Sequence, residues 1–147
     1  MTASRHGTSR VIVSVATQAT PDFLVLWNRA LGETVKWRGG REVVESIREG
    51  QSDDERAEQL VAARDVWVAR DEHGALLGFA LCRGGLIELL HVDRAHRRQG
   101  IARAILTTLA RSDNPPVDGL ALPGDRATKS LYESVGWKAR LLTMRGE

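Results

Sequence analysis

The spacing of apolar residues divides the first part of the chain into a strand and helices. Residues 10–17 are rich in valine and isoleucine and predict a buried strand. Pro21, suited to a first helical turn, and Gly32, suited to a helix end, bound a helix whose apolar residues share one broad face. Residues 34–40, which contain Trp37 and end in two glycines, predict a loop.

Two further helices are expected at residues 41–50 and 52–64. The second begins with Ser52-Asp53-Asp54-Glu55, the spacing of a capping box. These acidic residues can attract a cationic amine, but negative charge also stabilises the first turn of a helix. We therefore interpret the acidic group as structural.

Strands and helices alternate along the rest of the chain. The expected strands are 66–69, 75–81, 86–92, 119–122 and 137–144. The expected helices are 100–111 and 126–135. Antiparallel strands come first and strand-helix-strand crossovers follow. This order predicts an α/β (α+β) fold with one mixed, mostly antiparallel central sheet and helices on both faces.

Composition and charge favour one soluble domain spanning residues 1–147, with 42% hydrophobic and 27% charged residues. A net charge of +2 is too small to indicate a nucleic-acid or membrane partner. Cys82 is the only cysteine, so we expect no internal disulfide and no thiolate metal site, and its apolar neighbours predict a buried, inert thiol. Without a membrane-length apolar run or a signal-peptide core, a cytoplasmic location is expected.

The positive charge is concentrated in one turn, between the expected strand 86–92 and the expected helix 100–111. Its arginines are Arg94, Arg97, Arg98 and Arg103. A helix N-terminus binds anions through unpaired N–H groups and its dipole. Gly100 and Ala102 would let a pyrophosphate approach the backbone closely. On spacing alone, a solvated basic turn remains an open alternative.

Two motifs in the second half of the chain together resemble the GNAT superfamily of N-acetyltransferases. The acetyl-CoA signature of that family, Q/R-x-x-G-x-G/A, is matched by Arg97-Arg98-Gln99-Gly100-Ile101-Ala102. The element A-x-x-x-L/F-Y-x-x-x-G-F/W is matched by residues 127–137. The run Leu90-His91-Val92-Asp93 is similar to the end of the family's central strand. The resemblance implies a GNAT-like sheet with a splayed parallel strand pair.

The same resemblance implies acetyl-CoA as co-substrate, no metal, and direct attack by a primary amine of a small molecule or peptide through a tetrahedral intermediate. The acceptor itself remains unknown. The residues implied at the cofactor are Leu90, Val92, Arg97, Arg98, Gln99, Gly100, Ile101, Ala102, Arg103 and Asp125. Leu90 would supply a main-chain oxyanion donor. Family members often carry asparagine where this chain has Asp125, which is an equally good N-cap but can contact the cofactor differently.

Two side chains are candidates for the proton transfers. The resemblance implies Tyr132, the only tyrosine, as general acid beside the thioester sulfur, and a core tyrosine is the alternative. Glu88 is the candidate base, because a carboxylate in an apolar strand needs a function or a partner, and an ion pair with an arginine is the alternative. Strand parity places Glu88 on one face with Leu90 and Val92, and His91, interpreted as a packed histidine, on the other.

Several alternatives stay open at this stage. A non-catalytic acyl-CoA-binding regulatory module would keep the same turn, and a nucleic-acid-binding protein ranks last because exposed aromatic residues are not interleaved with the basic ones. In similar proteins the connection that corresponds to residues 34–40 covers the acceptor site, and we expect Trp37 to pack there rather than bind substrate.

Trp27 and Trp67 are expected in the core. The chain ends soon after Trp137, so a partner subunit could complete the sheet, and monomer and homodimer both fit.

Overall fold

A computed structural model describes residues 10–144 and 146, and its centre is a five-stranded sheet in the order β1-β2-β3-β4-β5. The strands are β1 (Val11–Val15), β2 (Val66–Asp71), β3 (Leu76–Arg83), β4 (Leu86–Val92) and β5 (Asp118–Gly119). The first four strands pair antiparallel, and β5 runs parallel to β4. The predicted mixed, mostly antiparallel sheet is therefore confirmed.

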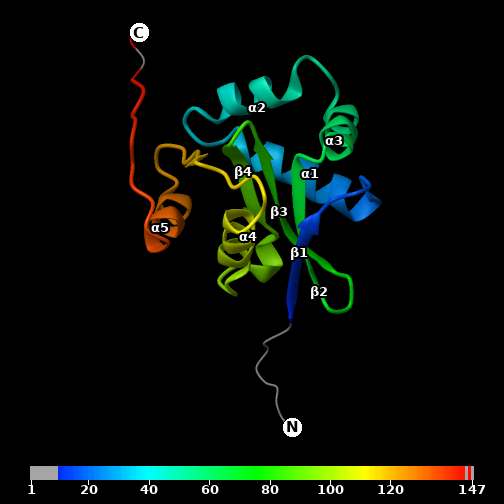
Figure 1. Ribbon diagram of the computed structural model, residues 1–147. Coiled ribbons are helices and arrows are strands. Elements are labelled where there is room, and N and C mark those ends of the chain that lie inside the picture. The colour runs from blue at the N-terminus through cyan, green and yellow to red at the C-terminus, as the bar shows by residue number, and fades with distance from the viewer. Residues whose placement is uncertain (1–9, 145, 147) are drawn as a thin grey trace.

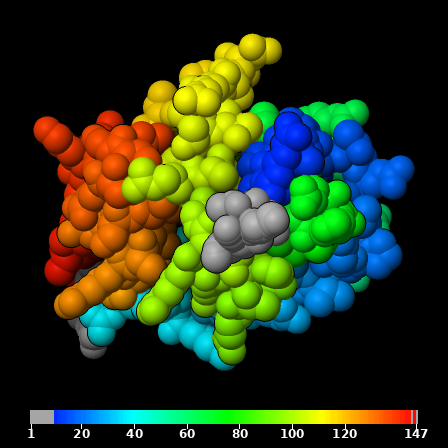
Figure 2. Space-filling view, turned by 90° about the horizontal axis from the view of Figure 1, so that it is seen from below, coloured from blue at the N-terminus to red at the C-terminus, as the bar shows by residue number. Residues whose placement is uncertain are grey.

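Helices cover both faces of the sheet, as expected (Figure 1). They are α1 (Pro21–Thr34), α2 (Gly40–Arg48), α3 (Asp53–Ala62), the short 3-10 helix η1 (Arg94–His96), α4 (Ile101–Ala110) and α5 (Arg126–Ser134). One face carries α1, α2 and α3, and the other carries α4 with α5 beside it. In the space-filling view, the yellow-green surface of α4 lies between the orange surface of α5 and the blue and green strands (Figure 2).

The alternation of side chains along β3 divides the interior into two apolar clusters. Phe79 belongs to the cluster under α1, α2 and α3, where its ring meets Phe23 edge-on at a centroid distance of 5.4 Å and Trp27 at 5.6 Å. Ala80, the next residue, belongs to the cluster under α4. Trp27 is fully buried, and Trp67 packs partly buried against the second cluster.

Helix α1 continues two residues past Gly32, which was expected to end it. The hydroxyl of Thr34 donates to the carbonyl of Ala30 at 2.7 Å, and the amide of Val35 donates to that of Leu31 at 3.1 Å. These bonds keep the last turn helical. Because α2 begins at Gly40, the connection between the two helices shortens to residues 35–39.

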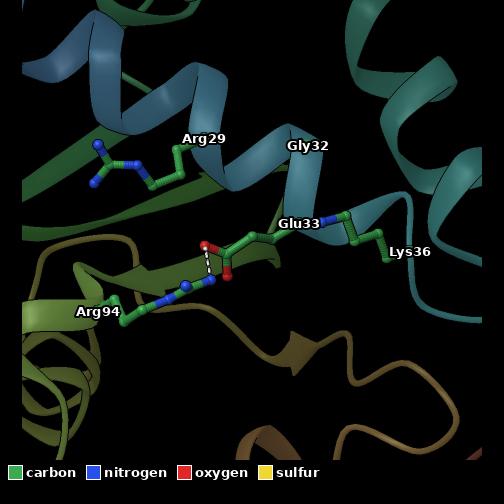
Figure 3. Close-up of a pocket in the computed structure, with 5 residues that line it drawn as sticks. All are labelled: Arg29, Gly32, Glu33, Lys36 and Arg94. Carbon is green, nitrogen blue, oxygen red and sulfur yellow. Dashed lines mark hydrogen bonds and ion pairs between the residues drawn. The ribbon is translucent and has the colours of Figure 1, made fainter.

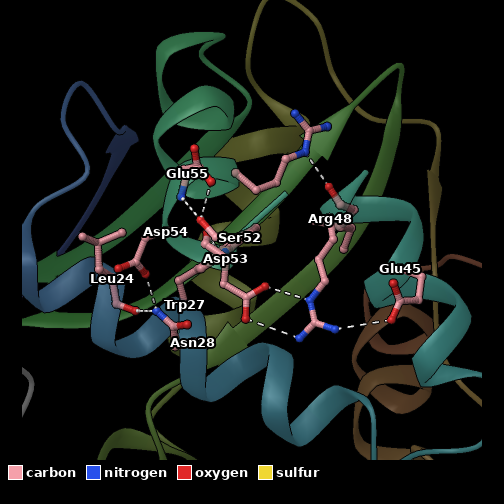
Figure 4. A network of polar contacts seen from close by, with 11 residues as sticks. Leu24, Trp27, Asn28, Glu45, Arg48, Ser52, Asp53, Asp54 and Glu55 are labelled. Atoms are coloured by element: carbon pink, nitrogen blue, oxygen red, sulfur yellow. Dashed lines mark hydrogen bonds and ion pairs between the residues drawn. The ribbon is translucent and has the colours of Figure 1, made fainter. Parts of the chain in front are cut away.

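The acidic group at the start of α3 is structural, as interpreted (Figure 4). Ser52 Oγ accepts the amide of Glu55 at 3.2 Å, which is one of the two bonds of a capping box, and the same hydroxyl donates to the Glu55 carboxylate at 2.8 Å. Asp53 pairs with Arg48 at 2.7 Å. Asp54 accepts a hydrogen bond from the amide group of Asn28 at 2.8 Å.

The expected strand at residues 137–144 does not form, and β5 covers residues 118–119 instead of 119–122. Beyond Trp137 the chain runs away from the body of the molecule (Figure 1). Leu141 is 82% exposed and Met144 79% exposed. A strand needs a neighbouring strand for its backbone hydrogen bonds, and the two-residue β5 provides no edge of sufficient length.

Candidate functional site

The two parallel strands β4 and β5 diverge after a short paired stretch. Leu86 lies opposite Asp118, and Ile87 opposite Gly119. The amide of Leu120 still donates to the carbonyl of Ile87 at 3.0 Å. Residues 88–92 of β4 have no register partner in β5, so the sheet opens there. This is the splayed strand pair that the family resemblance implied.

Glu88 lies at a β-bulge at the start of this opening. Leu89 is paired with Leu81, and Ile87 with Cys82, so Glu88 has no partner in β3. The extra residue turns Glu88 toward the face covered by α1, α2 and α3. The expectation that Glu88 shares a face with Leu90 and Val92 is therefore wrong, because strand parity assumes an uninterrupted pleat.

The carboxylate of Glu88 is bonded to Arg83. Arg83 Nε donates to Glu88 Oε1, and Arg83 Nη2 donates to Oε2 at 3.3 Å. The Glu88 side chain is 10% exposed. Arg83 also lies 3.5 Å from Glu49, which pairs with Arg56 at 2.9 Å. The ion pair considered as an alternative for Glu88 is thus present, and it belongs to a chain of four alternating charges.

The main chain of Leu90 and Val92 faces the opening between β4 and β5. The amide of Asp93 donates to the carbonyl of Leu77 on β3 at 2.8 Å. In an antiparallel ladder, successive residues direct their peptide groups to opposite sides. Leu90 and Val92 therefore direct theirs away from β3. The carbonyl of Val92 accepts a hydrogen bond from Arg97 Nε at 3.1 Å.

Tyr132, on α5, is 6% exposed and belongs to the second apolar cluster. Its ring stacks on Trp137 at 5.1 Å, with 11° between the planes. It also fills the space beside Gly119, where a Cβ would lie 2.6 Å from the Tyr132 hydroxyl oxygen. That oxygen is buried without a hydrogen-bond partner among the described residues, and burial raises the pKa of Tyr132 well above its ordinary value.

Tyr132 and Glu88 lie at the same level of β4 and on opposite faces of the sheet. Gly119, against which Tyr132 packs, is paired with Ile87, and Glu88 is the next residue of β4. The structure therefore brings both predicted catalytic side chains to the point where β4 and β5 diverge.

The arginine-rich turn presents unbonded amides at the start of α4. Arg98 and Gly100 have left-handed backbone angles, with φ of 65° and 77°. Among the residues that the structure describes, no side chain caps α4, so the amides of its first turn are left as free donors. Ile101 is 2% exposed, and its side chain packs in the second apolar cluster. Its main chain alone is available to a ligand. Gln99 is exposed, and Ala102 is half-buried.

Three other residues implied at the cofactor are held by neighbours in the fold. Arg97 Nη2 donates to Glu33 on α1 at 3.0 Å. Arg103 donates to the hydroxyl oxygen of Ser134 at 2.8 Å and so links α4 to α5. Asp125 is the N-cap of α5, and its carboxylate accepts the amide of Thr128 at 3.2 Å and its hydroxyl at 2.7 Å.

Glu33 is a residue of this region that the sequence did not single out. Arg94 also lies 3.4 Å from its carboxylate. Although burial raises it, the pKa of Glu33 is lowered overall by the hydrogen bond from Arg97 and by the positive charges of His91, Arg97 and Arg94. The buried Nε2 of His91 has no partner within residues 10–144 and 146, and burial lowers the pKa of His91. No local pattern could link Glu33 to a turn sixty residues later.

Glu33 and Arg94 line a hollow of about 510 Å³ between α1 and η1 (Figure 3). We call it the α1 hollow, and its lining residues are Arg29, Gly32, Glu33, Lys36 and Arg94. Among residues 10–144 and 146, no group of histidine, cysteine or acidic side chains has a geometry suited to a metal ion. Over the same residues, no helix has both the length and the apolar character of a membrane span.

Comparisons with known proteins agree with this geometry. Residues 62–139 match the family model described as an acetyltransferase (GNAT) domain. No curated protein sequence matches the chain.

Among solved structures, the chain resembles a ribosomal-protein-alanine N-acetyltransferase from Brucella melitensis biovar Abortus. The identity is 22%, the TM-score is 0.58, and the match covers 92% of this chain and 99% of that chain. A GNAT-family acetyltransferase from Listeria monocytogenes is 15% identical with a TM-score of 0.60, and the match covers 95% of this chain and 93% of that chain. A protein from Bacillus halodurans is 17% identical with a TM-score of 0.64, and the match covers 94% of this chain and 98% of that chain. These likenesses show the fold.

Proposed function

The chain belongs to the GNAT acetyltransferase family, and from that premise we propose that it is an N-acetyltransferase that moves the acetyl group of acetyl-CoA to a primary amine of a small molecule or peptide. The observation that carries the proposal is the hydroxyl of Tyr132. It is buried at the point where β4 and β5 diverge and has no hydrogen-bond partner in the part of the chain that the structure describes. A buried hydroxyl without a partner costs free energy, so its retention there is explained by a bond to a ligand.

The residues present fit coenzyme A. The uncapped start of α4, with Arg98 and Gly100 in left-handed conformations, suits the pyrophosphate. The peptide groups of Leu90 and Val92, directed away from β3, suit the pantetheine arm in the opening. Asp125 is occupied as a helix cap, and we propose no larger role for it than holding α5 in place. The bound acetyl-CoA would supply the reactive thioester.

Each of the chain's groups then has a definite part in the transfer. The Leu90 amide donates to the oxygen that becomes negative as the amine nitrogen attacks the acetyl carbon. Tyr132 gives its proton to the departing sulfur as the carbon–sulfur bond breaks. A tyrosine already keeps its proton at neutral pH at its ordinary pKa of about 10, and burial raises the pKa of Tyr132 further. Glu88 takes a proton from the amine, through water or after exchanging one of its bonds with Arg83.

A second candidate function is favoured by the ion pair of Glu88. Both of its carboxylate oxygens are bonded to Arg83, which is how a structural carboxylate is held. An acyl-CoA-binding module that regulates rather than catalyses would need the turn and the opening between β4 and β5, but no free base.

One experiment separates the two functions. Thiol release from acetyl-CoA is measured with a panel of amines, and thermal unfolding is measured with and without coenzyme A. Ligand at a hundred times its Kd adds about 3 kcal/mol, or about 5–10 °C for a domain of this size. Thiol release together with this shift supports the enzyme, and the shift alone supports the module. The absence of both would overturn the proposal.

A further inference from the structure

Most of the α1 hollow lies on the face of the sheet opposite the one that α4 covers, and Arg94 closes it from the turn before α4. Four of its five lining residues belong to α1 or follow it directly, and α1 packs on the face of Phe79 and Leu89. Helix α4 packs on the other face. If coenzyme A enters from the α4 side, as proposed, this hollow is open to the second substrate.

The loop between α1 and α2 reaches the loop between β5 and α5 beside this hollow. Trp37 lies against Gly124, where an added Cβ would be 3.6 Å from its ring. Leu122 lies at the same distance from a Cβ added at Gly39. Trp37 is 43% exposed, so it packs less fully than expected and presents ring surface at this junction. The loop that carries Lys36 of the α1 hollow therefore contacts the segment that follows β5.

Positive charge is in excess at the α1 hollow. The cations of the hollow and its rim are Arg29, Lys36, Arg94 and Arg97, and the anions are Glu33 and Asp93, so the balance is 4 − 2 = +2. Glu33 is shared by Arg94 and Arg97, and Asp93 lies 3.5 Å from Arg29. Lys36 has no ion-pair partner among the described residues and lies exposed on the wall of the hollow (Figure 3).

We infer that the acceptor of the proposed transfer is an amine with a remote anionic oxygen group, a carboxylate or a phosphate, which the α1 hollow binds through Lys36 and Arg94. This rests on the proposed function and names its substrate class. A guanidinium and an ammonium both bond such oxygens strongly. Glu88 and Arg94 are six residues apart along β4 and its extension, roughly 20 Å if extended. The amine and the anion are therefore separated by a long chain, and the longest acceptors of a series should fit best.

The test uses the full chain and matched acceptors. Aminobutanoate, aminohexanoate and aminooctanoate, each with the amine at the far end, are compared with their carboxamides and with aminoalkyl phosphates of equal length. KM and kcat are measured for the unaltered protein and for Lys36→Gln. The control is Arg111→Gln, which removes an exposed cation at the far end of α4.

We expect the longer anionic acceptors to have a KM about tenfold below that of their carboxamides. Lys36→Gln should raise the KM of the anionic acceptors about tenfold with kcat within about twofold, and should leave the carboxamides and the KM of acetyl-CoA unchanged. The better of the carboxylate and phosphate arms identifies the anion. Arg111→Gln should change neither KM.

Equal turnover of carboxylates and carboxamides would overturn the inference while the acetyltransferase proposal stands. A higher KM for acetyl-CoA in Lys36→Gln would also overturn the inference, because the α1 hollow would then bind the cofactor rather than the acceptor. If no amine released thiol from acetyl-CoA, the proposed function would fail. Calorimetry of aminooctanoate binding, with coenzyme A present, would then decide whether the α1 hollow binds an anion. Binding lost in Lys36→Gln supports an anion site, and no binding to the unaltered protein refutes it.

Discussion

The phenol ring of Tyr132 occupies the space that a side chain at Gly119 would need. A Cβ at Gly119 would lie 2.4 Å from Cζ of Tyr132 and 2.6 Å from its hydroxyl oxygen. The absence of a side chain at Gly119 therefore allows the hydroxyl to lie directly beside the paired end of the two parallel strands. Gly119 has no positive φ, so the requirement for glycine here comes from packing alone.

Gly119→Ala should displace the Tyr132 ring. Overpacking of this kind costs about 1–3 kcal/mol. We expect a lower melting temperature and a kcat reduced about tenfold or more, with little change in the KM of acetyl-CoA, because the turn before α4 is untouched. Val117→Ala, at a residue that is 75% exposed, is the control and should change stability by less than about 0.5 kcal/mol. Turnover at the unaltered rate would show that the position of Tyr132 is unimportant.

Tyr132→Phe separates a catalytic tyrosine from a core tyrosine. The hydroxyl has no partner among the described residues, so its removal leaves no other buried group unpaired. The free energy of unfolding should stay the same or rise by up to about 1 kcal/mol. The loss of the general acid should lower kcat about a hundredfold or more. Thermal unfolding and steady-state kinetics measure the two effects, and a stable variant with full activity would assign Tyr132 to the core.

The parts of the fold and the site that could be predicted from the sequence are those set by residues close together in the chain. The helix at α4 and its uncapped start follow from the arginine-rich turn and Gly100, and α5 follows from its N-cap, Asp125. Each depends on residues within one helical turn of it. The family motifs identified the splayed strand pair and Tyr132 for the same reason, since both motifs are contiguous in the sequence.

The rest depends on contacts between distant segments. The bulge at Glu88 exists only in the register of β4 against β3, so strand parity placed its side chain on the wrong face. The bond from Arg97 to Glu33 joins residues 64 positions apart. The strand expected at residues 137–144 would have needed a neighbour whose presence no local pattern reveals.

Gly100→Ala and Gly50→Ala form a matched pair. Their φ angles are 77° and 76°, and a Cβ at either position meets nothing within 4 Å. Each substitution should cost about 1–2 kcal/mol through the left-handed backbone conformation. Only Gly100→Ala should weaken coenzyme A binding, because a pyrophosphate would occupy the space that its Cβ enters. Melting curves give the stability loss, and calorimetric titration gives the Kd. Equal affinity in both variants would argue against a phosphate site at this turn.

Glu88→Gln and Arg83→Gln disrupt one ion pair from opposite ends. Each should lower the free energy of unfolding by about 1–3 kcal/mol, because a charge is left with fewer partners in a largely buried site. The two variants should therefore lose similar stability, but only Glu88→Gln removes the proposed base. We expect kcat/KM to fall about a hundredfold in Glu88→Gln and much less in Arg83→Gln. Similar kinetic losses in both variants would make the pair structural.

The pair of Asp22 and Arg70 should make stability depend on pH in acid. Arg70 bonds the Asp22 carboxylate at 2.7 Å and, against the effect of burial, lowers its pKa from 3.8 to about 2. The unfolded chain therefore takes up a proton before the folded chain does, so this stabilisation is complete above about pH 4 and is lost as pH falls toward 2.

A shift of that size corresponds to about 2 kcal/mol, but Asp22 is 47% exposed, so solvent screening reduces the contribution to about 0.5–1 kcal/mol. Asp22→Asn should lose that amount at pH 7 and only a small part of it near pH 2, measured by urea unfolding across this range. Asp113→Asn, at an exposed carboxylate without an ion pair among the described residues, is the control and should show no such pH-dependent difference. A deficit in Asp22→Asn that persisted unchanged at pH 2 would assign the effect to helix capping rather than to charge.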